Sequence, residues 1–222
     1  MTPPSAEKSL LISDFDGTVT ARDFYHLVTE QLFTDDTPDY WAEYEAGRVT
    51  HFEALRNIFQ AVPAGEPKLL ELIQQAGIEP NLSAEITALQ AAGWEVEIVS
   101  AGCGWYIQQL LRQHHVDVPV YASPGSIIEG RLVMELPTNS PYFSRETGID
   151  KSAVVKAALA EGKRVAYAGD GPVDLQPALL VPPELRFARS SLAHLLRSQG
   201  EGFYTFERWS DIARVLRTQP QL

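Results

Sequence analysis

Five short apolar segments, separated by stretches with helical periodicity, constrain the fold of this chain more than any other feature. The segments are Leu10–Phe15, Glu95–Ser100, Val118–Ala122, Arg164–Gly169 and Arg186–Ala188. Short apolar runs that alternate with helical patterns are typical of parallel strands, because each parallel connection needs a crossover, usually a helix. The sequence therefore predicts an α/β fold with a Rossmann-like, doubly wound parallel sheet rather than an all-α or all-β fold.

The stretch after the first predicted strand is too long for one crossover helix. It contains the helical patterns FYHLVTEQLF, HFEALRNIFQAV and PKLLELIQQA and no convincing strand. We interpret residues 22–76 as an all-helical cap inserted after the first strand, with residues 1–21 and 77–222 forming the core. Residues 126–136, SIIEGRLVMEL, are interpreted as two short extended runs joined at Glu129 and Gly130, which predicts a β-hairpin.

Composition and charge narrow the class of partner and the compartment. The 222 residues are 45% hydrophobic, enough to bury a sizeable core. A net charge of −11 argues against binding to nucleic acid or to an anionic membrane surface. One cysteine, Cys103, cannot form an internal disulfide, which favours a reducing compartment. No leader pattern and no apolar run of about 20 residues is found, so we expect a cytoplasmic protein.

The stretch LLISDFDGT places two carboxylates, Asp14 and Asp16, at the end of the first predicted strand. In a doubly wound sheet, ligands bind beyond the carboxyl ends of the strands. Repulsion between two such carboxylates is relieved by a cation, and Mg²⁺ is the natural choice next to a phosphate. Gly17 permits a tight turn whose backbone N–H groups face an anion. The alternative is an ordinary strand-to-turn junction capped by aspartate.

Three further stretches place polar groups near the end of a predicted strand or the start of a predicted helix. In VEIVSAGCGW, Ser100 ends a strand shortly before a helix, and in GIDKSAVV, Lys151 lies in the first turn of a helix. The helix dipole disfavours a cation there, so a local anion would explain that lysine. In YAGDGPVD, Asp170 and Asp174 follow a strand. The alternatives are a helix cap, a surface lysine and an acidic turn.

In this order and spacing, the four stretches resemble the haloacid dehalogenase superfamily of phosphatases. DFDGT is similar to its first motif, Ser100 to its second, Lys151 to its third and GDGPVD to its fourth. The helical insertion resembles the cap of the phosphoserine-phosphatase-like branch. DFDGTVTARD and HFEALRNIFQAVP are most similar to bacterial methionine-salvage phosphatases that act on 2-hydroxy-3-keto-5-methylthiopentenyl-1-phosphate.

The resemblance implies a role for each motif residue. Asp14 would be the nucleophile that forms an aspartyl-phosphate, and Asp16 the general acid and base. The phosphoryl oxygens would be bound by Gly17, Ser100, Ala101, Gly102 and Lys151. Asp14, Asp170 and the backbone carbonyl of Asp16 would bind Mg²⁺. Asp174 would be either a water-mediated ligand or the partner that holds Lys151.

The cap determines which substrate the resemblance implies. Phosphoserine phosphatases usually have a glutamate where this chain has Asp23, and the position of their cap arginine is occupied by Phe59, with Arg56 on the same helix. The cap pocket therefore looks more apolar than phosphoserine requires. Residues that could line it are Asp23, Phe24, Trp41, Phe52, Arg56 and Phe59, although aromatic residues at helical spacing are more often simple core.

We expect a hydrolase that acts on a small phosphorylated metabolite, as a monomer or homodimer, with methylthiopentenyl phosphate as the leading substrate. Phosphoserine, phosphocholine and phosphoethanolamine are the alternatives. A non-catalytic protein that binds a phosphorylated ligand is the alternative from another class. The complete set of Asp14, Asp16, Ser100, Lys151 and Asp170 favours catalysis, because a degenerate binder would be expected to have lost at least one of them.

Overall fold

A parallel sheet with β1 in its interior organises the molecule. In the computed structural model, which describes residues 8–218, six strands lie in the order β10-β9-β8-β1-β2-β3. All neighbouring strands in this sheet pair in parallel. The strands are β1 (Ser9–Ser13), β2 (Trp94–Cys103), β3 (Val120–Ser123), β8 (Arg164–Gly169), β9 (Arg186–Ala188) and β10 (Tyr204–Thr205). The predicted α/β fold is confirmed.

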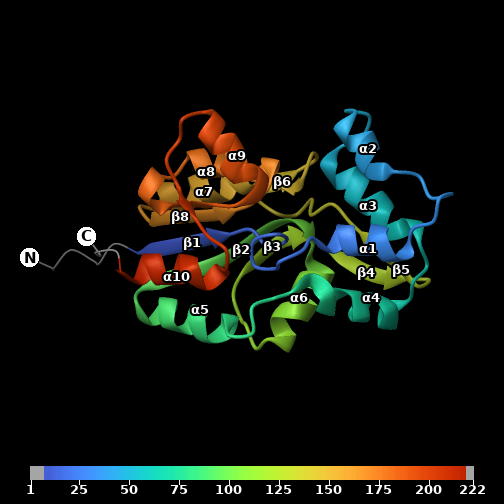
Figure 1. Ribbon diagram of the computed structural model, residues 1–222, viewed down its shortest axis with the longest axis horizontal. Helices are drawn as coiled ribbons and strands as arrows, with labels where there is room; N and C mark the ends of the chain where they lie inside the picture. The colour runs from blue at the N-terminus through green and yellow to red at the C-terminus, as the bar shows by residue number, and fades with distance from the viewer. Residues whose placement is uncertain (1–7, 219–222) are drawn as a thin grey trace, which may run out of the picture.

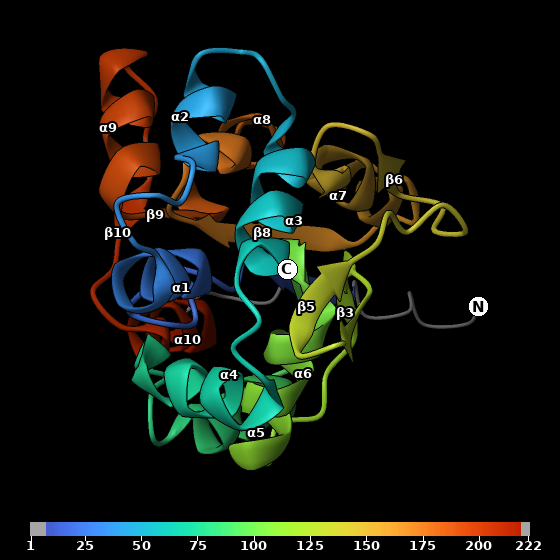
Figure 2. The same ribbon diagram turned by 90° about the vertical axis from the view of Figure 1, so that its right-hand side faces the viewer.

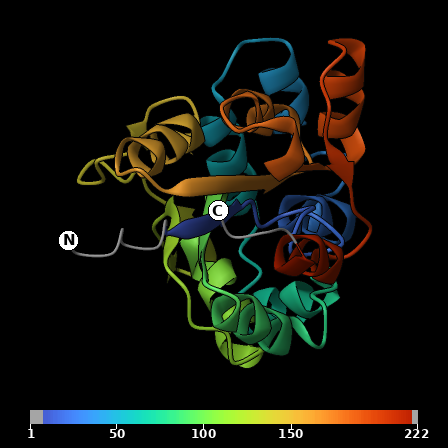
Figure 3. The ribbon, with the colours of Figure 1, turned by 90° about the vertical axis from the view of Figure 1, so that its left-hand side faces the viewer.

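Helices cover both faces of this sheet (Figure 1). On one face lie α7 (Lys151–Ala160), α8 (Leu175–Leu179) and α9 (Ser190–Ser198), and on the other α5 (Leu82–Ala91), α6 (Gly104–Gln113) and α10 (Trp209–Thr218). Figure 3 shows these two helical layers on either side of the strands. Consecutive residues of β1 face opposite layers, since Leu10 and Ile12 belong to one apolar cluster and Leu11 to the other.

Four helices between β1 and β2 lie beyond the C-terminal ends of these strands (Figure 1). They are α1 (Phe24–Leu32), α2 (Tyr40–Glu45), α3 (His51–Ala61) and α4 (Glu66–Ile73), followed by the short 3₁₀ helix η1 (Gln74–Ala76). The start and the end of this insertion are joined by a β-bridge between Thr20 and Ile78. We propose that residues 22–76 form the cap and the rest of the chain the core.

A hairpin outside the insertion packs against the cap helices, as Figure 2 shows for β5 and α3. It consists of β4 (Gly125–Ile128) and β5 (Arg131–Met134), and both turn residues have positive φ angles, 49° at Glu129 and 75° at Gly130. The Arg131 guanidinium donates to the carbonyls of Gln60 and Ala61, at 2.6 and 2.8 Å. The predicted hairpin is confirmed, and the structure adds that it supports the C-terminal end of α3.

The structure also differs from the sequence prediction in detail. β1 ends at Ser13, so Asp14 and Phe15 follow the strand, whereas β2 continues through Ser100 to Cys103. The prediction missed β10 and the two-residue strands β6 (Phe143–Ser144) and β7 (Gly148–Ile149), which are too short to show a periodicity. Two further 3₁₀ turns are η2 (Pro172–Asp174) and η3 (Pro183–Leu185).

Within residues 8–218, no helix has the length and apolar character needed to cross a membrane. Residues 1–7, part of the segment in which no leader pattern was found, lie outside the described residues.

Candidate active site

The loop after β1 turns sharply beneath the cap. The N–H of Asp14 continues the sheet by donating to the carbonyl of Ala168, and the carbonyl of Phe15 accepts from the N–H of Val19. Gly17 has a φ of 66°, and a Cβ there would lie 2.3 Å from Oδ2 of Asp170. Glycine is required at this position by both the backbone conformation and the close approach of a carboxylate.

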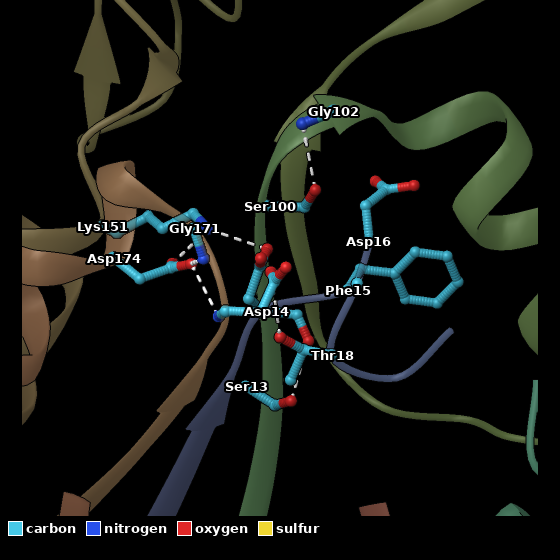
Figure 4. A network of polar contacts seen from close by, with 12 residues as sticks. Ser13, Asp14, Phe15, Asp16, Thr18, Ser100, Gly102, Lys151, Gly171 and Asp174 are labelled. Carbon is cyan, nitrogen blue, oxygen red and sulfur yellow. Dashed lines mark hydrogen bonds and ion pairs between the residues drawn. The ribbon is translucent and has the colours of Figure 1, made fainter. Parts of the chain in front are cut away.

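Lys151 is buried between two carboxylates (Figure 4). Its Nζ lies 2.7 Å from Oδ1 of Asp14 and 2.6 Å from Oδ1 of Asp174. Burial alone would lower the pKa of Lys151, but the negative charges of Asp14 and Asp174 raise it above its ordinary value. The lysine is therefore charged and in position to neutralise an anion beside Asp14. A surface lysine, the alternative at this position, is excluded.

Asp174 is fully occupied by donors from the protein. Oδ1 accepts from Lys151 Nζ and from the Tyr167 hydroxyl, each at 2.6 Å. Oδ2 accepts from the N–H groups of Asp170 and Gly171, at 3.1 and 3.0 Å. Burial opposes ionisation, but Lys151 and these hydrogen bonds hold the pKa of Asp174 below its usual value. Of the two roles expected for Asp174, these contacts favour holding Lys151.

Asp16 points away from Asp14 and Lys151 (Figure 4). Its Oδ2 accepts from the Tyr106 hydroxyl and its Oδ1 from the N–H of Phe24, at 3.0 Å. Burial and the charge of Asp23 raise the pKa of Asp16 to about 7, against the two hydrogen bonds, which lower it. A carboxyl with this pKa can both donate and accept a proton at neutral pH.

The end of β2 forms the wall opposite Lys151. Ser100 is buried, and its Oγ accepts from the N–H of Gly102 at 2.9 Å, which leaves the hydroxyl proton able to donate into the site. A Cβ at Gly102 would lie 2.0 Å from the Tyr106 hydroxyl and 2.9 Å from Oδ2 of Asp16. The position therefore tolerates only glycine while Tyr106 and Asp16 remain bonded.

Three carboxylates gather where a metal ion is expected. One oxygen from each of Asp14, Asp170 and Asp174 lies within 4.8 Å of the other two. Burial, then the charge of Asp174, raises the pKa of Asp14, and the same causes raise that of Asp170 to about 7. A divalent cation would offset this crowding of negative charge. Because all four lone pairs of Asp174 are taken, the carboxylates of Asp14 and Asp170 are the members of this group that are left to bind a cation.

These groups open into one cavity of about 990 Å³ between the core and the cap helices. Every core residue predicted for the site lines it: Asp14, Asp16, Gly17, Ser100, Ala101, Gly102, Lys151, Asp170 and Asp174. The cap helices and the loop before them contribute Asp23, Tyr25, Trp41, Tyr44, His51, Leu55 and Phe59, among others.

Three of the cap residues named from the sequence do not line this cavity, namely Phe24, Phe52 and Arg56. Phe24 is buried, and its ring packs against Tyr106 and Phe59 with centroid separations of 4.5 and 5.6 Å. The Arg56 guanidinium lies over the ring of Phe52, 5.8 Å from its centroid. Helical spacing placed these residues on the same helices as the lining residues but could not give the direction in which each side chain points.

Sequence reasoning missed Tyr106, Arg189 and His51, although all three line the cavity. The Arg189 guanidinium donates to the carbonyls of Gly17, Thr20 and Glu207, and so ties the loop after β1 to the C-terminal part of the chain. No local pattern marks these residues, because their partners are distant in sequence.

Comparison with known proteins agrees with this geometry. A family model described as haloacid dehalogenase-like hydrolase matches residues 11–178. A 2-hydroxy-3-keto-5-methylthiopentenyl-1-phosphate phosphatase from Brevibacillus brevis is 21% identical over 97% of this chain and 98% of its own. An enzyme of the same name from Exiguobacterium sibiricum is 24% identical over 94% of this chain and 96% of its own.

Solved structures share the fold. An HAD family hydrolase from Salmonella enterica serovar Typhi has a TM-score of 0.71 at 15% identity, over 99% of this chain and 74% of that one. A phosphoserine phosphatase solved as a phospho-aspartyl intermediate analogue has a TM-score of 0.66 at 17% identity, over 94% of this chain and 98% of that one. At these identities the likeness extends to the fold alone.

Proposed function

Because this chain belongs to the haloacid dehalogenase-like hydrolase family, we propose that it is a Mg²⁺-dependent phosphatase for 2-hydroxy-3-keto-5-methylthiopentenyl-1-phosphate. The observation that carries the proposal is the convergence of Asp14, Asp16 and Lys151 on one cavity beneath an aromatic cap. That the chain is a phosphoric monoester hydrolase rests on its family and its named relatives.

The first step would transfer the phosphoryl group to Asp14. A carboxylate oxygen of Asp14 attacks phosphorus, and the bond from phosphorus to the ester oxygen breaks. Asp16 donates its proton to the departing oxygen, which is supported by its pKa of about 7. The product alcohol leaves, and an aspartyl-phosphate remains on Asp14.

The second step would return the enzyme to its starting state. Asp16, now ionised, takes a proton from a water molecule that attacks phosphorus, and the bond from phosphorus to Asp14 breaks. Inorganic phosphate is released. In both steps the Lys151 ammonium, the Ser100 hydroxyl and the N–H of Ala101 would bind the equatorial oxygens, where negative charge spreads in the transition state, while the N–H of Gly102 orients the Ser100 hydroxyl.

Asp14, Asp170 and the carbonyl of Asp16 would hold Mg²⁺. When bound, the ion would offset the charge of the phosphate and of the carboxylates around it. Burial first, and the charge of Asp174 second, raise the pKa values of Asp14 and Asp170, so a cation bound between these carboxylates would stabilise their ionised forms.

The lining of the cap side supports a substrate without a carboxylate. Among the described lining residues, each cation already has a partner: Lys151 has Asp14 and Asp174, Arg22 has Glu30, and Arg189 has three backbone carbonyls. Two further acids, Asp23 and Glu45, line the same cavity and would repel a second anionic group. Tyr25, Trp41 and Phe59 offer an apolar wall for a thioether tail.

Phosphocholine or phosphoethanolamine is the second candidate substrate. Asp23 and Glu45 line the cavity together with the aromatic residues Trp41 and Tyr44, a combination that suits a cationic headgroup. Phosphoserine fits this lining less well because it would bring a carboxylate along with its ammonium.

Phosphate release with Mg²⁺ from all four esters tests the proposal, with Asp14→Asn as the inactive control. We expect the highest kcat/KM for the methylthiopentenyl ester, and a value for phosphoserine at least about tenfold lower. The highest value for phosphocholine would assign the second candidate. If the wild type releases phosphate no faster than Asp14→Asn from any of the four esters, the phosphatase assignment is contradicted. That result would favour a non-catalytic binder.

A further inference from the structure

His51 is a buried polar residue of the cap that the mechanism above does not use. It is the first residue of α3, has 8% of its surface exposed, and lines the cavity. Thr50 and Glu53 form a capping box that fixes the start of this helix. The N–H of the next residue, Phe52, donates to the carbonyl of Glu146 at 2.9 Å. The backbone therefore holds the imidazole in a defined place between cap and core.

The Nδ1 atom of His51 is buried and has no hydrogen-bond partner among residues 8–218. A buried polar atom without a partner costs free energy, so such atoms are rare and each needs a physical explanation. Among residues 8–218, one other buried side-chain atom has no hydrogen-bond partner. It is Oγ of Ser123, and Ser123 does not line the cavity.

The surroundings of His51 define what it can bind. The rings of Trp41 and Tyr44 meet it edge-on, with centroid separations of 5.5 and 5.3 Å. Burial, together with the positive charge of Lys151, lowers the pKa of His51 to about 4, against the smaller effect of Asp174. The imidazole is neutral at physiological pH, so it offers one donor and one acceptor nitrogen and no charge.

We propose that His51 hydrogen-bonds an uncharged oxygen of the substrate, a hydroxyl or a carbonyl, between the phosphate held by Lys151 and the aromatic wall of the cap. The substrate class is then a phosphate monoester whose carbon skeleton carries neutral oxygen. This inference rests on the proposed phosphatase function. It agrees with a 2-hydroxy-3-keto ester, whose hydroxyl and carbonyl carbons are the first and second carbons after the one that carries the phosphate.

A matched pair of esters tests the assignment. Hydroxyacetone phosphate and n-propyl phosphate differ only in one carbonyl, so the ratio of their kcat/KM values isolates the contribution of that oxygen. In His51→Phe, which keeps a ring but cannot hydrogen-bond, we expect the ratio to fall about 10- to 100-fold. The value for n-propyl phosphate should stay within about threefold. His51→Asn, which keeps a neutral side chain able to donate and accept a hydrogen bond, should recover part of the ratio.

His194→Phe is the control, because it removes an exposed histidine of α9 outside the cavity. It should leave the ratio unchanged. A ratio that does not move in a folded His51→Phe variant overturns the assignment.

Binding measured without turnover separates this inference from the phosphatase proposal. In Asp14→Asn protein labelled with ¹⁵N-histidine, hydroxyacetone phosphate should shift the His51 ring resonances, and n-propyl phosphate should not. This measurement does not require His51→Phe to fold or any ester to be hydrolysed. If the wild type hydrolyses neither ester but the shift occurs, the phosphatase proposal fails and the His51 assignment stands. Equal shifts with both esters would overturn the His51 assignment.

Discussion

At the scale of single residues, the proposed mechanism depends on how the protein positions the carboxyl of Asp16. Asp16 must change protonation state between the two proposed steps, and its carboxyl is oriented by two donors, the Tyr106 hydroxyl and the N–H of Phe24. Tyr106 is itself fixed, because its buried ring packs against Phe24 and Phe59. We therefore interpret Tyr106 as a positioning residue for Asp16.

Tyr106→Phe should lower kcat about tenfold or more for an alkyl phosphate, with little change in KM, because Asp16 loses one of its two donors. The loss should be smaller for p-nitrophenyl phosphate, whose leaving group needs little protonation. Steady-state kinetics on both esters checks this. Equal losses for both would mean that the hydroxyl affects the shape of the cavity rather than the proton transfer.

At the scale of elements, the loop after β1 is held by a residue from the other end of the fold. Arg189 follows β9, and its guanidinium donates to Gly17 and Thr20 in this loop and to Glu207 before α10. Its guanidinium also lies over the ring of Phe206, 5.2 Å from the centroid. The loop that carries Asp16 and Gly17 therefore depends on β9 being in place.

Arg189→Met keeps most of the stem and removes these hydrogen bonds. We expect a loss of about 1–3 kcal/mol in the free energy of unfolding, measured with urea, and faster amide exchange in residues 17–20. Arg208→Met, the same change at an exposed arginine, is the control. A variant as stable as the control, with unchanged exchange in the loop, would show that Arg189 does not hold it.

At the scale of the whole molecule, cap and core share one apolar cluster. Phe24, Phe52 and Leu72 of the cap helices belong to the same cluster as Leu11 and Val96 of the sheet. The cavity lies beside this cluster and contains buried acids. Folding therefore removes these carboxyl groups from water, which costs free energy when they are ionised. Stability should therefore depend on pH and on the metal.

Without metal, stability should fall as pH rises from about 5 to 7 and should level off above about 8. The pKa values of Asp16 and Asp170 are raised to about 7 in the folded protein, so the native state holds protons that the unfolded state has already lost. The stabilisation is complete below the unfolded pKa and is lost as pH rises through about 7. His51, whose lowered pKa has the opposite effect below about pH 6.5, offsets only part of this fall, because two carboxyls act against one imidazole.

Thermal unfolding at several pH values, with chelator and with excess Mg²⁺, measures this dependence. Mg²⁺ should raise Tm and flatten the slope, because it stabilises the ionised carboxylates. Asp170→Asn should have a shallower slope and a weaker response to Mg²⁺. A Tm that rises with pH over this window in chelator would contradict the account.

The sequence predicted those parts of the fold whose cause is local. The apolar runs at Arg164–Gly169 and Arg186–Ala188 match β8 and β9, and Glu129 and Gly130 form the hairpin turn. The core site residues could be predicted because parallel strands bring their carboxyl ends to one edge. Tyr106, Arg189 and His51 could not, since each is defined by partners or a cavity that exist only after folding.

Acid quenching during turnover tests most directly whether Asp14 carries the phosphoryl group. Enzyme mixed with Mg²⁺ and its best substrate, quenched in acid and digested, should yield the peptide containing SDFDGTV heavier by one phosphoryl group. Fragmentation should place that group on Asp14, and Asp14→Asn should show no label. Rapid turnover with no phosphoryl group on Asp14 at any quench time, or a label on another residue, would contradict the account.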